Sequence, residues 1–117
     1  MRTVGLHHVS INVTDVDAAL DFYVGRLGLV ARPDRPNFGF GGAWLDAGAQ
    51  QVHLIEAEPP PDQGQHLALL VEDLDAAVAE LRGQGLSVSD PKPVGSSWQS
   101  FLHDPAGNLV ELHRAGR

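Results

Sequence analysis

Apolar and polar residues alternate along residues 7–13, "HHVSINV". Val9, Ile11 and Val13 fall on one side of an extended chain, and His8 falls on the other side, which is the period of a β-strand. The pattern therefore predicts a strand with one apolar face. It also places the His8 side chain on the face opposite the three aliphatic residues.

The period changes immediately after this strand. Apolar residues recur at i, i+3, i+4, i+7 and i+11 from Val16 to Leu27, which predicts a helix with one apolar stripe. Asp15 precedes the stripe and can act as its N-cap, and Gly28 follows it as a stop signal. We expect Tyr23, on the stripe, to be a core residue. Short apolar runs with glycine and proline between them come next, "LVARP", "FGFGGAWLDAG" and "QQVHLIE", and indicate three further strands.

The same order of patterns occurs twice. A shift of 58 positions places His8 on His66 and Asp15 on Asp73, and "HHVSINVTDVDAAL" then matches "QHLALLVEDLDAAV". The second copy has its own helical stripe and its own later runs, "LSVSDPKP", "SWQSFLHDPAG" and "NLVELHR". Each copy reads β-α-β-β-β. We predict one domain over residues 1–117, made of modules 4–57 and 65–114, with the proline-rich segment 58–64 as the linker between them.

Composition narrows the function classes. The net charge of −7 and the lack of a basic run argue against a nucleic-acid surface. No cysteine is present, which excludes disulfides, thiolate metal sites and cysteine nucleophiles. We expect no membrane association, because no apolar run is long enough, and a cytoplasmic location, because the first residues do not read as a signal peptide.

Metal-capable side chains stand at equivalent positions of the two copies. His8 matches His66 in the first strand, and the same 58-residue shift matches His53 with Glu111 in the last strand. Two copies related by a pseudo-twofold axis would bring these four residues together. Nitrogen and oxygen donors of this kind suit a divalent transition metal such as Ni, Zn, Co, Mn or Fe(II), with open positions for water or substrate.

The chain resembles the vicinal oxygen chelate superfamily, which contains glyoxalases, bleomycin resistance proteins and extradiol dioxygenases. The resemblance rests on "HHVSINVTDVDAALDFYVGRLGL", "QHLALLVEDLDAAVAEL" and "FLHDPAGNLVELH". It implies an α+β fold in which two βαβββ modules form a cup-shaped mixed sheet with helices outside, often within a homodimer. It also implies metal ligation by His8, His53, His66 and Glu111. Glyoxalase I-like members usually carry glutamate at the position of His53.

Several residues are candidates for contact with a small, partly apolar substrate. The aromatic candidates belong to the segments predicted as middle strands, which line the cup in this architecture: Trp44, Trp98, Phe40 and Phe101. Parity alone leaves open which of them face the ligand and which face a helix; the 58-residue shift matches Trp44 with Leu102. His113, two residues beyond Glu111, is either a contact of the substrate or a solvent-facing residue. Arg32 and Arg35 either reach an anionic group of the substrate or lie in a solvated loop.

Three functions remain open. The first is a metal-dependent lyase or isomerase of the glyoxalase type, which acts on a small carbonyl-containing substrate with Glu111 as the catalytic base. The second is a metal-dependent thiol transferase or dioxygenase of the same superfamily. The third is a non-catalytic resistance protein that binds a drug or metabolite, as bleomycin resistance members do.

Overall fold

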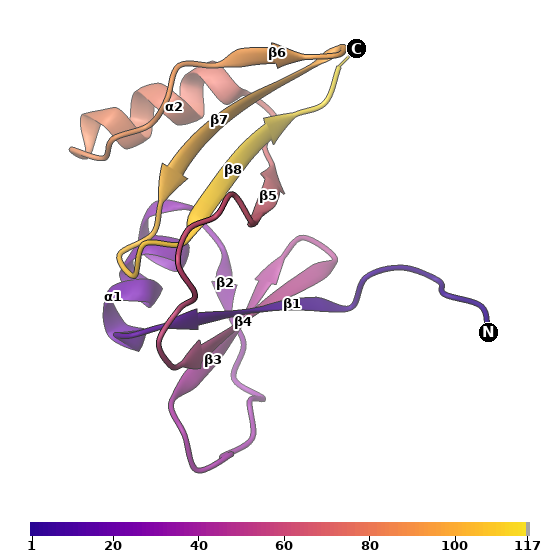
Figure 1. The fold of residues 1–117 in the computed structure, drawn as a ribbon, viewed down its shortest axis with the longest axis vertical. Helices are drawn as coiled ribbons and strands as arrows, with labels where there is room; N and C mark the ends of the chain where they lie inside the picture. The colour runs from indigo at the N-terminus through magenta and orange to yellow at the C-terminus, as the bar shows by residue number, and fades with distance from the viewer. Residues whose placement is uncertain (117) are drawn as a thin grey trace. The chain divides into compact units, whose positions relative to one another are not determined.

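Residues 1–116 are described by the computed structural model and form an α+β architecture with two four-stranded mixed sheets (Figure 1). The chain divides into two compact units, with unit 1 covering Met1–Pro61 and unit 2 beginning at Asp62. This boundary lies inside segment 58–64. In the described residues, no helix is both long enough and apolar enough to cross a bilayer.

Unit 1 contains β1 (His8–Val13), α1 (Val16–Leu20), the π-helical η1 (Asp21–Arg26), β2 (Val30–Ala31), β3 (Gly42–Ala47) and β4 (Gln50–Glu56). Its sheet has the order β1-β4-β3-β2, with β1 and β4 parallel and the other pairs antiparallel. Alternate residues of the strands and the aromatic residues of the helical segment form the core, which includes Val13, Phe22, Tyr23, Leu45 and Leu54.

Unit 2 contains β5 (His66–Leu70), α2 (Leu74–Gly83), β6 (Lys92–Val94), β7 (Ser97–His103) and β8 (Leu109–Arg114). Its sheet has the order β5-β8-β7-β6, and β5 and β8 are parallel. The helix α2 contacts β7 and β8 and buries its apolar stripe in the core of the unit; Figure 1 shows it beside β7. This stripe consists of Leu74, Val78 and Leu81.

The two units repeat the same strand register. His8 pairs with Gln51 between β1 and β4, and His66 pairs with Leu109 between β5 and β8, so both partners move by the same 58 positions. The prediction of an α+β fold built from a repeated β-α-β-β-β unit is confirmed. The cup that the resemblance implies involves both units and stays a prediction.

The helix starts follow the predicted chemistry. The Asp15 carboxylate accepts a hydrogen bond of 3.0 Å from the Ala18 backbone N–H, and Asp73 accepts the equivalent bond from Ala76 at 3.0 Å. Each bond satisfies one of the free N–H groups of a first helical turn. Gly28 has a φ of 80°, a backbone conformation that glycine adopts without steric cost, and ends the first helical segment as predicted.

The first helical segment is not one continuous α-helix, which corrects the prediction. After Leu20 the chain continues as π-helix, and the Leu27 N–H donates to the Phe22 carbonyl, five residues earlier, at 2.9 Å. Phe22 and Tyr23 are adjacent in sequence and both buried, with an edge-to-face contact at 4.9 Å between ring centroids. The wider turn accommodates two adjacent aromatic residues on the core side.

The segments around the middle strands also differ from the prediction. Phe38 and Phe40 precede β3, which starts at Gly42, because Gly39 adopts a φ of 82° and donates its N–H to Asn37 Oδ1 at 2.9 Å. These contacts form a turn where a strand was predicted. The two strands predicted from "LVARP" and "LSVSDPKP" shrink to two and three residues.

The repeat offset changes by one residue in the middle strands. Trp44 is the cross-strand partner of His53, and Phe101 is the cross-strand partner of Glu111. Trp44 is therefore equivalent to Phe101, 57 positions later, and the predicted match of Trp44 with Leu102 is wrong. The longer β7–β8 turn, which Asp104 closes with hydrogen bonds from the N–H groups of Ala106 and Asn108, absorbs the difference.

Candidate metal centre

The first pair of predicted metal ligands lies in unit 1, on the sheet face opposite the buried Val52 and Leu54 side chains. His8 extends from β1 and His53 from the neighbouring β4, and their rings stack with centroids 3.9 Å apart and planes 11° apart. His8 is exposed, whereas His53 is only 7% exposed. Strand parity therefore brings these two imidazoles together as predicted.

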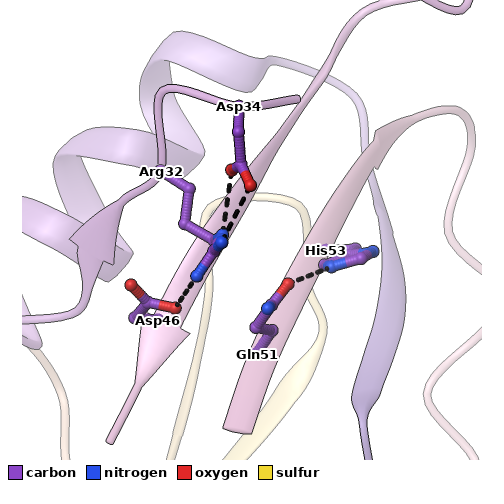
Figure 2. Close-up of polar contacts among 5 residues, drawn as sticks. All are labelled: Arg32, Asp34, Asp46, Gln51 and His53. Carbon is purple, nitrogen blue, oxygen red and sulfur yellow. Dashed lines mark hydrogen bonds and ion pairs between the residues drawn. The ribbon is translucent and has the colours of Figure 1, made fainter. Parts of the chain in front are cut away.

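Burial and neighbouring groups together favour the neutral form of His53. Burial lowers the pKa of the His53 imidazole, and the nearby charges of His8, His7, Arg32 and Arg35 lower it further. The Nε2–H of His53 donates to Gln51 Oε1 at 2.8 Å, as Figure 2 shows. A neutral imidazole is the form that binds a metal.

The second pair lies in unit 2 and combines a histidine with a carboxylate. His66 Nε2 is 3.1 Å from Glu111 Oε1, across the parallel pair β5 and β8. Glu111 is 7% exposed. On the other side of the His66 ring, Nδ1–H donates to the Gly64 carbonyl oxygen at 2.7 Å.

The Gly64 contact determines the chemistry of this second pair. Because Nδ1 carries the hydrogen, Nε2 of a neutral His66 presents a lone pair to a carboxylate oxygen, so a cation must stand between the two acceptors. A proton can fill this role: the Gly64 hydrogen bond and the Glu111 carboxylate raise the pKa of His66, against an opposing effect of burial. A divalent ion can fill it equally well, since two donors about 2.0–2.1 Å from one ion lie roughly 3 Å apart. His66 and Glu111 therefore fit as two of the donors that a metal would need.

The other oxygen of Glu111 is also held. His113 lies on the same face of β8 and its Nδ1 is 2.8 Å from Glu111 Oε2, so the ring donates to this oxygen when Nδ1 is protonated. The side chain of His113 is half-buried. The two carboxylate oxygens of Glu111 thus point at two different histidines. This arrangement fixes the plane of the carboxylate.

Two of the predicted substrate contacts accompany these donors. Trp44 stacks on His53 with centroids 4.5 Å apart and planes 12° apart. Phe101 contacts His66 edge to face at 5.3 Å. Each pair of donors therefore has one aromatic residue from the adjacent middle strand beside it.

The other two aromatic candidates lie elsewhere. Trp98 is the cross-strand partner of Arg114, on the face of the unit 2 sheet that carries α2, and with Leu74 and Asp75 it lines a pocket of about 310 Å³. The structure does not bring it together with Glu111. Phe40 lies in the turn before β3, half exposed, and reaches the unit 1 pair only through Phe38 and Trp44, as described below.

The two arginines of the same region have different partners. Arg32 binds both oxygens of Asp34, at 2.9 and 2.8 Å, and Asp46 Oδ1 at 2.9 Å (Figure 2). These contacts raise the pKa of Arg32 and hold the pKa of Asp34 below its usual value, with the hydrogen bond between them as the main cause in both cases. The positive charge of Arg32 is therefore balanced by carboxylates within the protein. Arg35 makes no such ion pair within residues 1–116.

Three further contacts of the donors did not follow from the sequence patterns. Gln51 binds His53, the Gly64 carbonyl binds His66, and His7 contacts His8 with their Nδ1 atoms 2.8 Å apart. Gln51 shares a strand face with His53, so strand parity could have identified it. The Gly64 contact depends on the linker conformation, which has no periodic signal. Over the part of the chain that the structure describes, no three His, Asp or Glu residues form a metal-binding group.

A family model matches residues 5–112, nearly the whole chain, and carries the description Glyoxalase/Bleomycin resistance protein/Dioxygenase superfamily. The chain belongs to this superfamily. Among curated relatives, it is 32% identical to a probable lactoylglutathione lyase from Synechocystis, over 92% of each protein. It is 27% identical to the metallothiol transferase FosB from Shouchella clausii, over 93% of this chain and 79% of that protein.

Solved structures share the fold over the full length of the chain. A glyoxalase family protein from Bacillus anthracis superposes with a TM-score of 0.88 at 26% identity and 100% coverage of both chains. The antibiotic-binding protein TnmS3 from a Streptomyces species superposes with a TM-score of 0.84 at 26% identity and 99% coverage of both chains. The proteins that this chain resembles therefore include named enzymes and a named antibiotic-binding protein.

Proposed function

We propose that the protein is a divalent-metal-dependent lyase or isomerase of the glyoxalase type, acting on a small carbonyl-containing substrate in the cytoplasm. Its metal ligands would be the unit 1 pair, His8 and His53, and the unit 2 pair, His66 and Glu111. The two pairs would come from one chain or from the two chains of a homodimer. The observation that carries the proposal is the 3.1 Å approach of His66 Nε2 to Glu111 Oε1, with Nδ1 of the same ring committed to Gly64.

The donor set fits this chemistry. Three neutral imidazoles and one carboxylate would hold a divalent ion at a formal charge of about +1. When bound, such an ion supplies a Lewis acid that polarises carbonyl oxygens of the substrate. The protein supplies the position of the substrate and the group that accepts its proton.

Glu111 is the group suited to move a proton. It is the only carboxylate of the four donors, and its low exposure keeps it out of bulk water. One of its oxygens faces His66 and the other faces His113 at 2.8 Å. A proton taken by Glu111 from carbon next to the substrate carbonyl could be returned from the same carboxyl group. His113 would hold the carboxyl group in one orientation during this transfer.

A binding function is the second candidate. The chain shares its fold over almost its full length with TnmS3, described as an antibiotic-binding protein, and a row of exposed and half-buried aromatic rings reaches the unit 1 pair. A thiol transferase activity has the weaker support of the 27% identity to FosB. Turnover with proton exchange separates the first candidate from the others.

Metal binding is the first test. Protein purified without an affinity tag is analysed for metal content, then treated with a chelator and melted in the presence of Ni, Zn, Co, Mn or Fe(II). A ligand that binds only the folded state must raise the melting temperature. We expect at least one of these ions to do so. If none changes the melting temperature, the proposed metal centre is wrong. A panel of small 2-oxoaldehyde, thiol and 2-oxoacid substrates then tests the reaction class.

A further inference from the structure

We infer that the segment from Arg35 to Trp44 is a specificity subsite for a substrate that carries a planar apolar group and a negative charge. The inference deepens the proposed function, on which it rests, because it assigns a substrate class to the site at His8 and His53. Unit 1 alone supplies every residue on which it depends.

A row of aromatic rings connects the surface turn to the unit 1 pair. Phe40 and Phe38 stack at 5.6 Å with planes 17° apart, and Phe38 contacts Trp44 at 6.1 Å. Trp44 in turn stacks on His53, and His53 stacks on His8. Phe38 and Phe40 are 49% and 50% exposed, which is unusual for two adjacent large apolar rings. Flat apolar ligands bind such rings by stacking.

A guanidinium group lies on the exposed end of this row. The Arg35 Cζ atom is 5.1 Å from the centroid of the Phe38 ring and 5.5 Å from that of the Phe40 ring. Its Nη2 donates to the Phe40 carbonyl oxygen at 3.0 Å. These contacts fix the group in place by cation–π attraction and one hydrogen bond. Within residues 1–116 no carboxylate neutralises it, in contrast to Arg32, which binds Asp34 and Asp46.

The backbone leaves space for this guanidinium group. A Cβ atom at position 42 would lie 2.8 Å from Arg35 Nη2 and would also collide with the Leu54 carbonyl oxygen. Glycine at position 42 therefore permits the close approach of the side chain to β3. A positioned arginine with N–H groups that are not used by a carboxylate is suited to bind a carboxylate, sulfonate or phosphate.

The ligand class follows from these two features together. Its negative group would bind Arg35, its planar apolar part would lie against Phe38, Phe40 and Trp44, and its carbonyl end would reach His53. An aromatic or similarly flat carboxylate satisfies all three requirements. A small neutral carbonyl compound satisfies only the last.

Binding of 2-naphthoate to chelator-treated protein tests the subsite, with uncharged 2-naphthamide as the matched probe. Two-dimensional ¹H–¹⁵N NMR titrations tolerate weak binding and report its location. We expect 2-naphthoate to shift the Trp44 indole N–H and the backbone signals of residues 37–42. Arg35→Gln should weaken 2-naphthoate about tenfold, because it removes a charge-assisted hydrogen bond, and should change 2-naphthamide less than twofold. Phe38→Ala should weaken both probes.

Arg82→Gln is the control, since it removes an arginine of unit 2, where it is exposed and paired with Asp90. It should leave both affinities unchanged. Equal effects of Arg35→Gln on the two probes, or shifts that avoid residues 37–44, would overturn the inference. Because the titrations use metal-free protein, their failure leaves the metal centre intact. In turn, a failure of metal binding would not contradict a measured 2-naphthoate site.

Discussion

The two pairs of donors occupy equivalent strands in the same register, yet their electrostatics are opposite. In unit 1, burial and neighbouring positive groups lower the pKa of His53. In unit 2, the Gly64 carbonyl and Glu111 raise the pKa of His66. The Gly64 hydrogen bond is the largest cause of the raised pKa of His66, ahead of Glu111, and burial is the largest cause of the lowered pKa of His53. A repeated scaffold can thus lower the pKa of a histidine in one copy and raise the pKa of a histidine in the other.

Glu111→Gln is expected to have the largest effect. Loss of the only carboxylate should lower turnover of an identified substrate by about 10²- to 10⁴-fold, the range typical of a general base. Three imidazoles remain, so appreciable metal should be retained. Steady-state kinetics and metal analysis of the same sample measure both quantities. A fully active Glu111→Gln protein would remove the proton-transfer role and favour a transferase or a binding protein.

His66→Ala is expected to remove metal binding. The loss of affinity should be at least about a hundredfold, because even the loss of a group that only orients a ligand costs 10- to 100-fold. His8→Ala should have a similar effect. Competition with a chromogenic chelator measures the affinity. Leu70→Ala, at the exposed end of the same strand as His66, is the control and should bind metal normally. Normal affinity in both histidine variants would contradict the four-donor centre.

A mixture of these two variants distinguishes a centre within one chain from a centre shared by two. If each centre combines unit 1 of one chain with unit 2 of the other, a mixed dimer of His8→Ala and His66→Ala has one complete set of donors. Metal binding should then recover to about one ion per mixed dimer. The readout is metal content after the two proteins are unfolded and refolded together. No recovery in a mixture that light scattering shows to be dimeric would assign the centre to a single chain.

His53→Ala should reduce metal affinity less than His66→Ala does. His53 Nε2 is already hydrogen bonded to Gln51, and its ring lies between Trp44 and His8. Metal binding would have to break some of these contacts, which reduces the net contribution of His53 to the metal affinity. We expect a loss of roughly tenfold, similar to that for a ligand's supporting group. The same chelator competition measures it. An unchanged metal affinity would show that His53 lines the pocket without binding the metal, which leaves three ligands.

The smallest effect concerns pH in the metal-free protein. A raised pKa means that His66 contributes stability below the unfolded value of about 6.5, and this contribution is lost as pH rises through the folded pKa. The lowered pKa of His53 acts in the opposite direction: its contribution is present above about pH 6.5 and is lost as pH falls. Histidine ring signals followed by NMR from pH 4 to 9 should titrate in the order His53 before His66 as pH rises. The reverse order would contradict the contrast between the two pairs.

Periodicity and the repeat predicted most of the fold. Three features depend on local chemistry and could therefore be predicted directly from the sequence: the strand alternation, the helix caps at Asp15 and Asp73, and the helix end at Gly28. The π-helical turn arose from packing two adjacent aromatic residues, and the one-residue offset of Trp44 arose from turn length. Neither feature has a periodic signal.

The candidate site was predicted in part. Parity placed His8 beside His53 and His66 beside Glu111, because neighbouring strands of known register must align these faces. Trp98 was one of four aromatic candidates whose side of the sheet parity left open, and it lies on the face that carries α2. Whether the two pairs of candidate ligands bind one ion depends on how the edge strands β1 and β5 are covered. No local sequence pattern encodes this, so the four-ligand centre stays a prediction.

The division of donors, two in each unit, has a thermodynamic consequence. Under the proposed arrangement neither unit holds enough ligands alone, so an ion binds tightly only where the units are brought together. Linkage is reciprocal: whatever free energy assembly adds to metal affinity, the metal adds to assembly. Starvation for the metal would then loosen the association of the units as well as remove the Lewis acid. The stability of the assembled centre would therefore increase with the concentration of the free metal ion.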